Sequence, residues 1–102
     1  MDINEIKQVP IVDFLYILGI EPVKHKASGL WYHAPYHNDR NPSLRVSTDK
    51  NVWYDYGIAR GGDIFNLAGE FINSNEFVAQ AKFISETLGG SFPTSFPHYQ
   101  RI

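Results

Sequence analysis

Four side chains in the middle of the chain are of types that bind metal ions: His33, His37, Asp39 and Asp55. Imidazole nitrogens and carboxylate oxygens suffice for zinc or manganese without any thiolate. The four residues therefore predict either a metal site, which would also allow a metal-dependent nuclease, or a set of surface and capping groups. Pro35 separates the two histidines, which consequently do not form an i, i+4 pair on one helix face and can point apart.

A short Arg-Gly-Gly turn before a predicted helix is the second feature that could bind a ligand. Residues 60–62 precede Asp63, and the unpaired N–H groups of a helix N-terminus attract anions such as phosphate. Asp63 is itself a good N-cap, and its carboxylate would satisfy the same N–H groups. The turn predicts either a phosphate contact that includes Arg60 or plain loop-to-helix geometry.

Basic and aromatic residues are interleaved in the middle third of the chain. Residues 24–60 contain six Lys and Arg against three Asp, a sum of +3, although the whole chain carries −2. The same segment holds most of the Tyr and Trp residues: Trp31, Tyr32, Tyr36, Trp53, Tyr54 and Tyr56. Such a segment can follow a phosphate backbone and stack bases. The alternative is a solvated face over an aromatic core.

Length and composition restrict the class of protein. The 102 residues, 43% of them hydrophobic, are enough for one small domain with a single core. The chain has no cysteine, which excludes a disulfide framework and a thiolate zinc site. It has no apolar run as long as a signal peptide or a membrane span, so we expect a cytoplasmic protein with no membrane partner. Neither a Walker loop, a nucleophile elbow nor an acidic cluster is present, so we expect no catalytic site in this chain.

The elements that must position these residues are a small sheet and about three helices. Apolar residues at helical spacing predict a helix over residues 10–18, with Pro10 in its first turn and Gly19 as its C-terminal cap. Residues 30–36 predict a strand cut short by Pro35. Alternation over residues 43–47 and strand formers at 52–56 predict a hairpin.

Two further helices are predicted after residue 63. Residues 64–72 and 77–88 carry apolar side chains on one helical face, and Gly89 and Gly90 close the second helix. The fold class is therefore α+β, with an antiparallel sheet of about three or four strands packed against about three helices. Residues 1–90 are predicted to form the domain. Residues 91–102, which contain two prolines and no periodicity, are predicted to be a linker or disordered tail that leads to a downstream domain.

The middle segment resembles the N-terminal zinc-ribbon domain of bacterial DnaG-type DNA primases and of related primases of phages and mobile elements. The resemblance rests on the run Ala34-Pro35-Tyr36-His37 with Asn41-Pro42-Ser43, then on Asp55-Tyr56-Gly57-Ile58, and then on Gly61-Gly62-Asp63 opening a helix. It covers roughly residues 8–89 and includes the flanking helices. It implies a zinc-ribbon-like sheet and a role in DNA replication.

The resemblance fails at the family's four zinc-ligand positions, which hold Ala34, His37, Asp55 and Ile58. A structural zinc site needs four donors, and alanine and isoleucine cannot donate. We therefore expect no zinc and no other cofactor, and a ribbon closed instead by hydrophobic packing of Ala34, Ile58 and the nearby aromatic rings.

By resemblance, the domain would bind the single-stranded DNA template for primer synthesis without being the polymerase. The residues expected to contact nucleic acid are Arg40, Arg45, Lys50, Trp53, Tyr54 and Arg60. Because Trp53 and Tyr54 alternate across one strand, at least one of the two rings belongs to the core. The alternative is a degenerate ribbon that serves as a structural or docking module towards a helicase or another replication protein.

Overall fold

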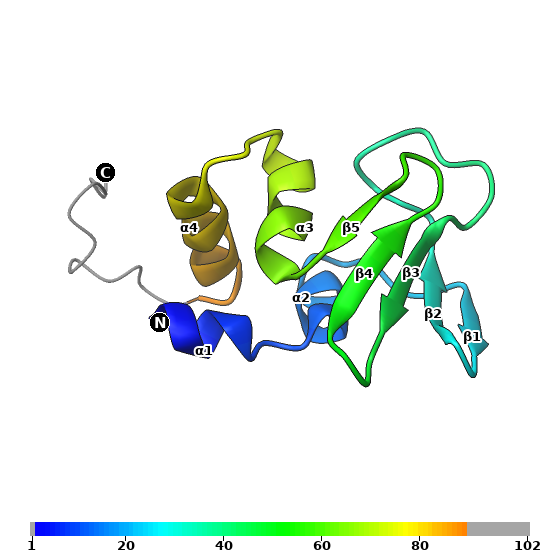
Figure 1. Cartoon of the computed structure of the whole chain (residues 1–102), viewed down its shortest axis with the longest axis horizontal. Helices are drawn as coiled ribbons and strands as arrows, with labels where there is room; N and C mark the ends of the chain where they lie inside the picture. Colours follow the sequence, from blue (N-terminus) through cyan, green and yellow to red (C-terminus); the bar gives the residue numbers. More distant parts are fainter. Residues whose placement is uncertain (1, 90–102) are drawn as a thin grey trace.

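The computed structural model describes residues 2–89, which form one five-stranded antiparallel sheet and four helices (Figure 1). The elements follow in the order α1 (Ile3–Lys7), α2 (Ile11–Ile17), β1 (Lys24–Lys26), β2 (Gly29–Tyr32), β3 (Leu44–Ser47), β4 (Val52–Asp55), β5 (Arg60–Gly62), α3 (Ile64–Ile72) and α4 (Phe77–Thr87). The predicted α+β class is confirmed. The predicted linker at residues 91–102 lies outside the described residues.

The sheet is a simple meander in which each strand pairs with the next in the chain. The predicted hairpin is formed by β3 and β4, and its turn contains Asn51 at a φ of 53°. The sheet has more strands than predicted because β1 and β5 were not recognised. Residues 60–62, which were predicted to form a turn, pair with β4 as strand β5, with Gly61 opposite Tyr54.

The helices begin and end close to the predicted residues. Pro10 is the N-cap of α2 and does not lie in its first turn, and Gly19 follows the helix at a φ of 83°. Asp63 caps α3 by accepting hydrogen bonds from Phe65 N and Asn66 N. Helix α1 was missed, although Asp2 and Glu5 form a capping box that marks its start.

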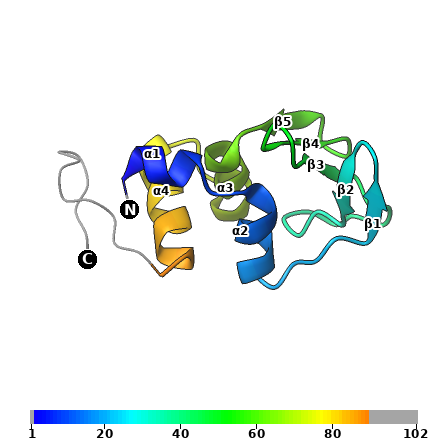
Figure 2. The ribbon, with the colours of Figure 1, turned by 90° about the horizontal axis from the view of Figure 1, so that it is seen from below.

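One hydrophobic core joins the helices to one face of the sheet. Inward residues of the strands, among them Leu44, Val46 and Trp53, pack in a single cluster with Phe14 of α2 and Leu67 of α3. In Figure 2, α2 lies below and to the left of β5, next to α3, and α1 and α4 lie farther to the left. Side chains on the opposite sheet face are thereby left outside this core. None of the helices among residues 2–89 is long and apolar enough to span a bilayer.

Candidate nucleic-acid interface

A row of side chains crosses the sheet on the face turned away from the core. Strand register places Lys24, Trp31, Arg45, Tyr54 and Gly61 opposite one another on β1 to β5. Their neighbours along the strands, such as Tyr32, Leu44 and Val46, are buried on the other side. Because side chains alternate across a strand, the whole row lies on one face.

Aromatic rings cover the middle of this row. Trp31 stacks on Tyr56 with ring centroids 5.6 Å apart and planes at 18°. Tyr54 meets Tyr56 edge-to-face at 4.7 Å. The ammonium of Lys26 lies 5.6 Å from the centre of the Trp31 ring, in cation–π range. We define the outer sheet face by the residues Lys24, Lys26, Trp31, Arg45, Tyr54 and Tyr56.

The charge of the strands is positive on this side. Lys24, Lys26 and Arg45 lie on this side, whereas Arg60 stands opposite Asp55 and lies on the other face. The five strands contain a single acid, Asp55. Asp55 is on the inward side of β4 and has no exposed surface. The outer sheet face therefore combines cations with flat rings, the two components of a surface that binds single-stranded nucleic acid.

Two donors beneath the outer sheet face lack a partner. Trp31 Nε1 and Arg45 Nε are both buried and find no acceptor within residues 2–89, while the Arg45 guanidinium donates through another nitrogen to Ser28 O. An unpaired buried donor costs about 1–3 kcal/mol.

The structure divides the six predicted contact residues into several groups. Arg45 and Tyr54 lie on the outer sheet face. Trp53 does not, because it is only 3% exposed and its Nε1 donates to Asp63 O at 2.8 Å and to Asn66 Oδ1 at 3.1 Å. Arg40, in the loop between β2 and β3, and Lys50, in the β3–β4 turn, are exposed.

Sequence reasoning missed four contributors to the outer sheet face, because none of them was predicted as a contact: Lys24, Lys26, Trp31 and Tyr56. The alternation of residues 52–56 indicates which side chains of that segment share a face with Tyr54. Extending that face to residues 24–31 requires the pairing of the strands, which the sequence does not give. Lys26 follows Lys24 by two residues on β1 and therefore lies on the same face, with its ammonium over the Trp31 ring.

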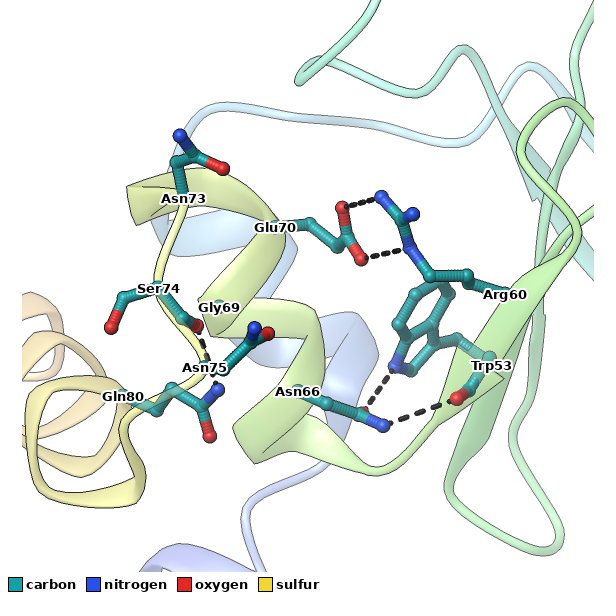
Figure 3. A pocket seen from close by; sticks show the side chains of 10 residues that line it. Trp53, Arg60, Asn66, Gly69, Glu70, Asn73, Ser74, Asn75 and Gln80 are labelled. Atoms are coloured by element: carbon teal, nitrogen blue, oxygen red, sulfur yellow. Dashed lines mark hydrogen bonds and ion pairs between the residues drawn. The ribbon is translucent and has the colours of Figure 1, made fainter.

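Arg60 belongs to a polar cleft beside the sheet. The cleft has a volume of about 510 Å³ and lies between β5, α3 and the turn that leads to α4 (Figure 3). Arg60 forms a two-pronged ion pair with Glu70, through Nε and one terminal nitrogen, each at 2.7 Å. The N–H groups at the start of α3, which were considered as a phosphate contact, already donate to the Asp63 carboxylate, as expected for the alternative of plain loop-to-helix geometry.

Two short segments, which we call the knuckles, contain the four positions that correspond to zinc ligands: residues 34–37 and 55–58. They meet at the Asp55 carboxylate. Oδ2 accepts hydrogen bonds from Tyr36 Oη and His37 Nε2, both at 2.8 Å. Oδ1 accepts from Gly57 N at 2.8 Å and lies 2.9 Å from Ser43 Oγ. We call Tyr36, His37, Ser43, Asp55 and Gly57 the Asp55 cluster.

A second carboxylate supports the same loop. Asp39 Oδ2 accepts from Ala34 N at 2.8 Å and from Ser43 N at 3.2 Å. The Ser43 hydroxyl lies 2.9 Å from both Asp39 and Asp55 and can donate its one proton to only one of them at a time. The two carboxylates thereby hold the 34–43 loop against the end of β4.

The charges of the Asp55 cluster reinforce one another. Burial alone would raise the pKa of Asp55, but hydrogen bonds from Tyr36, His37, Gly57 and Ser43 outweigh it and hold this pKa below its ordinary value. Burial likewise opposes the charged form of His37, and the hydrogen bond and negative charge of Asp55 outweigh it, so the pKa of His37 is raised. The cluster therefore contains an imidazolium–carboxylate pair over an intermediate pH range.

Comparison with known proteins places this arrangement in a family. The model of the CHC2 zinc finger, a zinc ribbon of DnaG type, matches residues 2–99. The chain belongs to this family. The zinc-ribbon resemblance seen in the sequence is thereby confirmed.

Similar proteins and a similar structure agree with the family. The chain is 34% identical to a DNA primase of Staphylococcus aureus over 88 residues. This alignment covers 84% of the chain and 14% of the primase. It is 33% identical to a DNA primase of Enterococcus faecalis over 75 residues, an alignment that covers 72% of the chain and 9% of that primase. The chain thus spans about a tenth of the length of these relatives. A crystal structure of the Aquifex aeolicus primase, which contains its zinc-binding and RNA polymerase domains, shares this fold over 23% of its chain. The match has a TM-score of 0.67 and 21% identity and covers 91% of the present chain.

The residues of this CHC2 member do not fit the zinc that the family name implies. Ala34 and Ile58 offer no donor, and His37 Nε2 is already bonded to Asp55. Residues 2–89 contain no group of three or more His, Asp or Glu side chains that could hold a metal ion. The predicted set of His33, His37, Asp39 and Asp55 accordingly does not converge on one point: Asp39 binds the backbone of its own loop, and His33 Nδ1 lies 3.0 Å from Asp39 O.

Proposed function

We propose that this domain is a primase-type module that binds the single-stranded DNA template through its outer sheet face and is not catalytic by itself. The observation that carries the proposal is the row of rings and cations in register across the sheet, Lys24, Trp31, Arg45 and Tyr54. Membership of a primase family supports DNA as the nucleic acid.

The geometry suits a single strand better than a duplex. Trp31, Tyr54 and Tyr56 present rings on a shallow sheet surface, and unpaired bases can lie on such rings at a gain of about 1–3 kcal/mol per base. Lys24, Lys26 and Arg45 flank the rings and would neutralise phosphates. Binding would weaken as salt rises, because each neutralised phosphate releases counterions.

Predicted residues outside the face take secondary roles in this proposal. Arg40 and Lys50 are exposed and extend the cationic surface beyond the sheet. Arg60 would contact phosphate only after releasing Glu70. Trp53 contributes through the core that supports Tyr54 from the other side of β4.

The wider role follows from the relatives, which are much longer than this chain. Primer synthesis would be carried out by another domain, and the template module would deliver DNA to it. Such a module would act in the cytoplasm, beside the replicating DNA, as part of a chromosomal or a mobile-element primase and with a helicase as a partner.

A titration with short mixed-sequence single-stranded DNA, followed by tryptophan fluorescence, tests the proposal. We expect saturable quenching that weakens from low to moderate salt. The signal should come from Trp31, so a Trp31→Phe variant should lose most of it, whereas Trp53 is shielded in the core. Absence of any change at low salt would overturn the proposal.

The alternative is a docking module for a replication protein. The overall charge of −2 and two exposed apolar residues on α2, Tyr16 at 70% and Ile17 at 51%, favour it. A domain that ignores DNA but binds a replicative helicase, with loss of binding on Ile17→Glu, would support this alternative.

A further inference from the structure

Asp55, at one of the positions that correspond to the family's zinc ligands, is a fully buried carboxylate. We propose that the Asp55 cluster replaces the zinc ion as the group that closes the ribbon, so that the domain reaches its native fold without any metal. This inference concerns folding and does not depend on the proposed DNA binding.

Asp55 joins the same two knuckles that a metal would join. It belongs to the second knuckle, and two of its donors, Tyr36 Oη and His37 Nε2, come from the first. Gly57 N, a third donor, closes the second knuckle on itself. The Ser43 hydroxyl, from the residue before β3, lies at hydrogen-bond distance from Asp55 and shares its one proton between Asp55 and Asp39. One side chain therefore ties together segments that are far apart in the sequence, as a tetrahedral ion does.

The acceptor capacity of Asp55 is used by these contacts. A carboxylate has about four lone-pair sites, and Asp55, with no exposed surface, has three donors at 2.8 Å and the Ser43 hydroxyl at 2.9 Å. Burying an unpaired carboxylate would be strongly unfavourable. Here the charge faces His37, whose imidazolium form is favoured by the same contact.

Gly57 lies tightly against the other side chains of the Asp55 cluster. A methyl group built on Gly57 would lie 3.0 Å from Ser43 Oγ and 3.1 Å from both Asp55 Oδ1 and His37 Cε1. Such contacts are tighter than ordinary packing. The cluster is a packed, hydrogen-bonded unit.

Sequence reasoning assigned this role to hydrophobic packing, and the structure supports only part of that. Tyr36 does pack edge-to-face on Trp53 at 6.4 Å and on Phe71 at 5.6 Å. Trp31, Tyr54 and Tyr56 instead cover the outer sheet face. Tyr36 thus contributes in two ways: its ring packs on apolar neighbours, and its hydroxyl donates to Asp55.

Metal analysis and thermal unfolding test the proposal on the whole chain, expressed and purified with zinc present. We expect far less than one zinc per chain and the same melting temperature with and without EDTA. Asp55→Asn keeps the shape but loses the charge and places an amide N–H₂ against other donors. It should lower the melting temperature by about 5 °C or more, while the exposed-turn control Asp49→Asn should leave it unchanged.

A second variant covers the case in which Asp55→Asn fails to fold. Tyr36→Phe removes one donor and retains the carboxylate and the packed ring, so it should melt measurably below the wild type, whereas the exposed control Tyr16→Phe should not. Stoichiometric zinc, a lower melting temperature in EDTA, or cluster variants that melt like their controls would each overturn the proposal.

Discussion

Trp31 and Tyr56 stack across strand β3, with ring centroids 5.6 Å apart, although Trp31 belongs to β2 and Tyr56 follows β4. The stack exists only because β2, β3 and β4 lie side by side in this register. It lies on the outer sheet face and supplies the first test of the proposed DNA binding.

Replacing either ring should weaken DNA binding without unfolding the domain. We expect Trp31→Ala and Tyr56→Ala each to reduce affinity for single-stranded DNA about 5- to 150-fold, the equivalent of one lost base stack. Fluorescence anisotropy of labelled DNA measures this directly. Tyr16→Ala, which removes an exposed ring from α2, is the control, and equal affinities for all three variants would refute the assignment of the rings.

Removing cations should change the salt dependence. Arg45→Ala and Lys50→Ala are expected to weaken binding to any DNA sequence and to reduce the slope of log affinity against log salt by about one unit each. Lys7→Ala on α1, away from the sheet, should leave the slope unchanged. If both test variants keep the wild-type slope, the phosphate contacts lie elsewhere.

The Asp55–His37 pair should give the domain a stability maximum at mildly acidic pH. The lowered pKa of Asp55 contributes stability above its ordinary value of 3.8, and this is lost as the pH falls through the folded-state pKa. The raised pKa of His37 contributes stability below its ordinary value of 6.5, and this is lost as the pH rises through the folded-state pKa. Asp39, whose pKa is also lowered because hydrogen bonds outweigh the effect of its burial, adds to the acid side.

Urea unfolding across this pH range measures the effect. The wild type should be most stable between roughly these two ordinary values. His37→Gln, which carries no charge at any pH, should be less stable at the maximum and should lose the decline on the alkaline side. A decline of the same size in His37→Gln would show that another group causes it.

Asn51 should contribute to stability through a contact that spans the fold. Its Oδ1 accepts from Ile11 N at 2.8 Å and its Nδ2 donates to Val9 O at 2.9 Å, which ties the β3–β4 turn to the start of α2. Asn51→Gly preserves the positive φ and removes both bonds, so we expect a loss of about 1–2 kcal/mol in the free energy of unfolding. Asn73 has the same φ of 53° and its side chain has no hydrogen-bond partner among residues 2–89, so Asn73→Gly is the matched control.

Gly29 should tolerate no side chain. Its φ is +140°, and a Cβ there would overlap the backbone oxygen of Val46 in the neighbouring strand. We expect Gly29→Ala to cost about 2–3 kcal/mol in urea unfolding. Gly19→Ala, at a φ of +83° with open space around it, should lose only about 1 kcal/mol from backbone strain, and a smaller loss at Gly29 than at Gly19 would contradict the packing of β2 on β3.

The sequence by itself determined the local elements and the missing metal ligands. Proline, glycine and Asp63 fix helix ends through backbone geometry and capping, and alternation fixes the β3–β4 hairpin, because these effects act within a few residues. Ala34 and Ile58 lack donor atoms whatever the fold. The short strands β1 and β5 escaped prediction because three residues carry too little periodicity.

Only the tertiary structure decided which side chains face outward and what replaced the metal. Trp53 and Tyr54 are adjacent and similar, and their roles differ because the helices cover only the sheet face that carries Trp53. Likewise, the sequence left Asp55 either as a metal ligand or as a surface or capping group, and the structure shows it buried with donors from residues 36, 37 and 43. Both outcomes depend on contacts between distant segments, which residue type and local spacing do not encode.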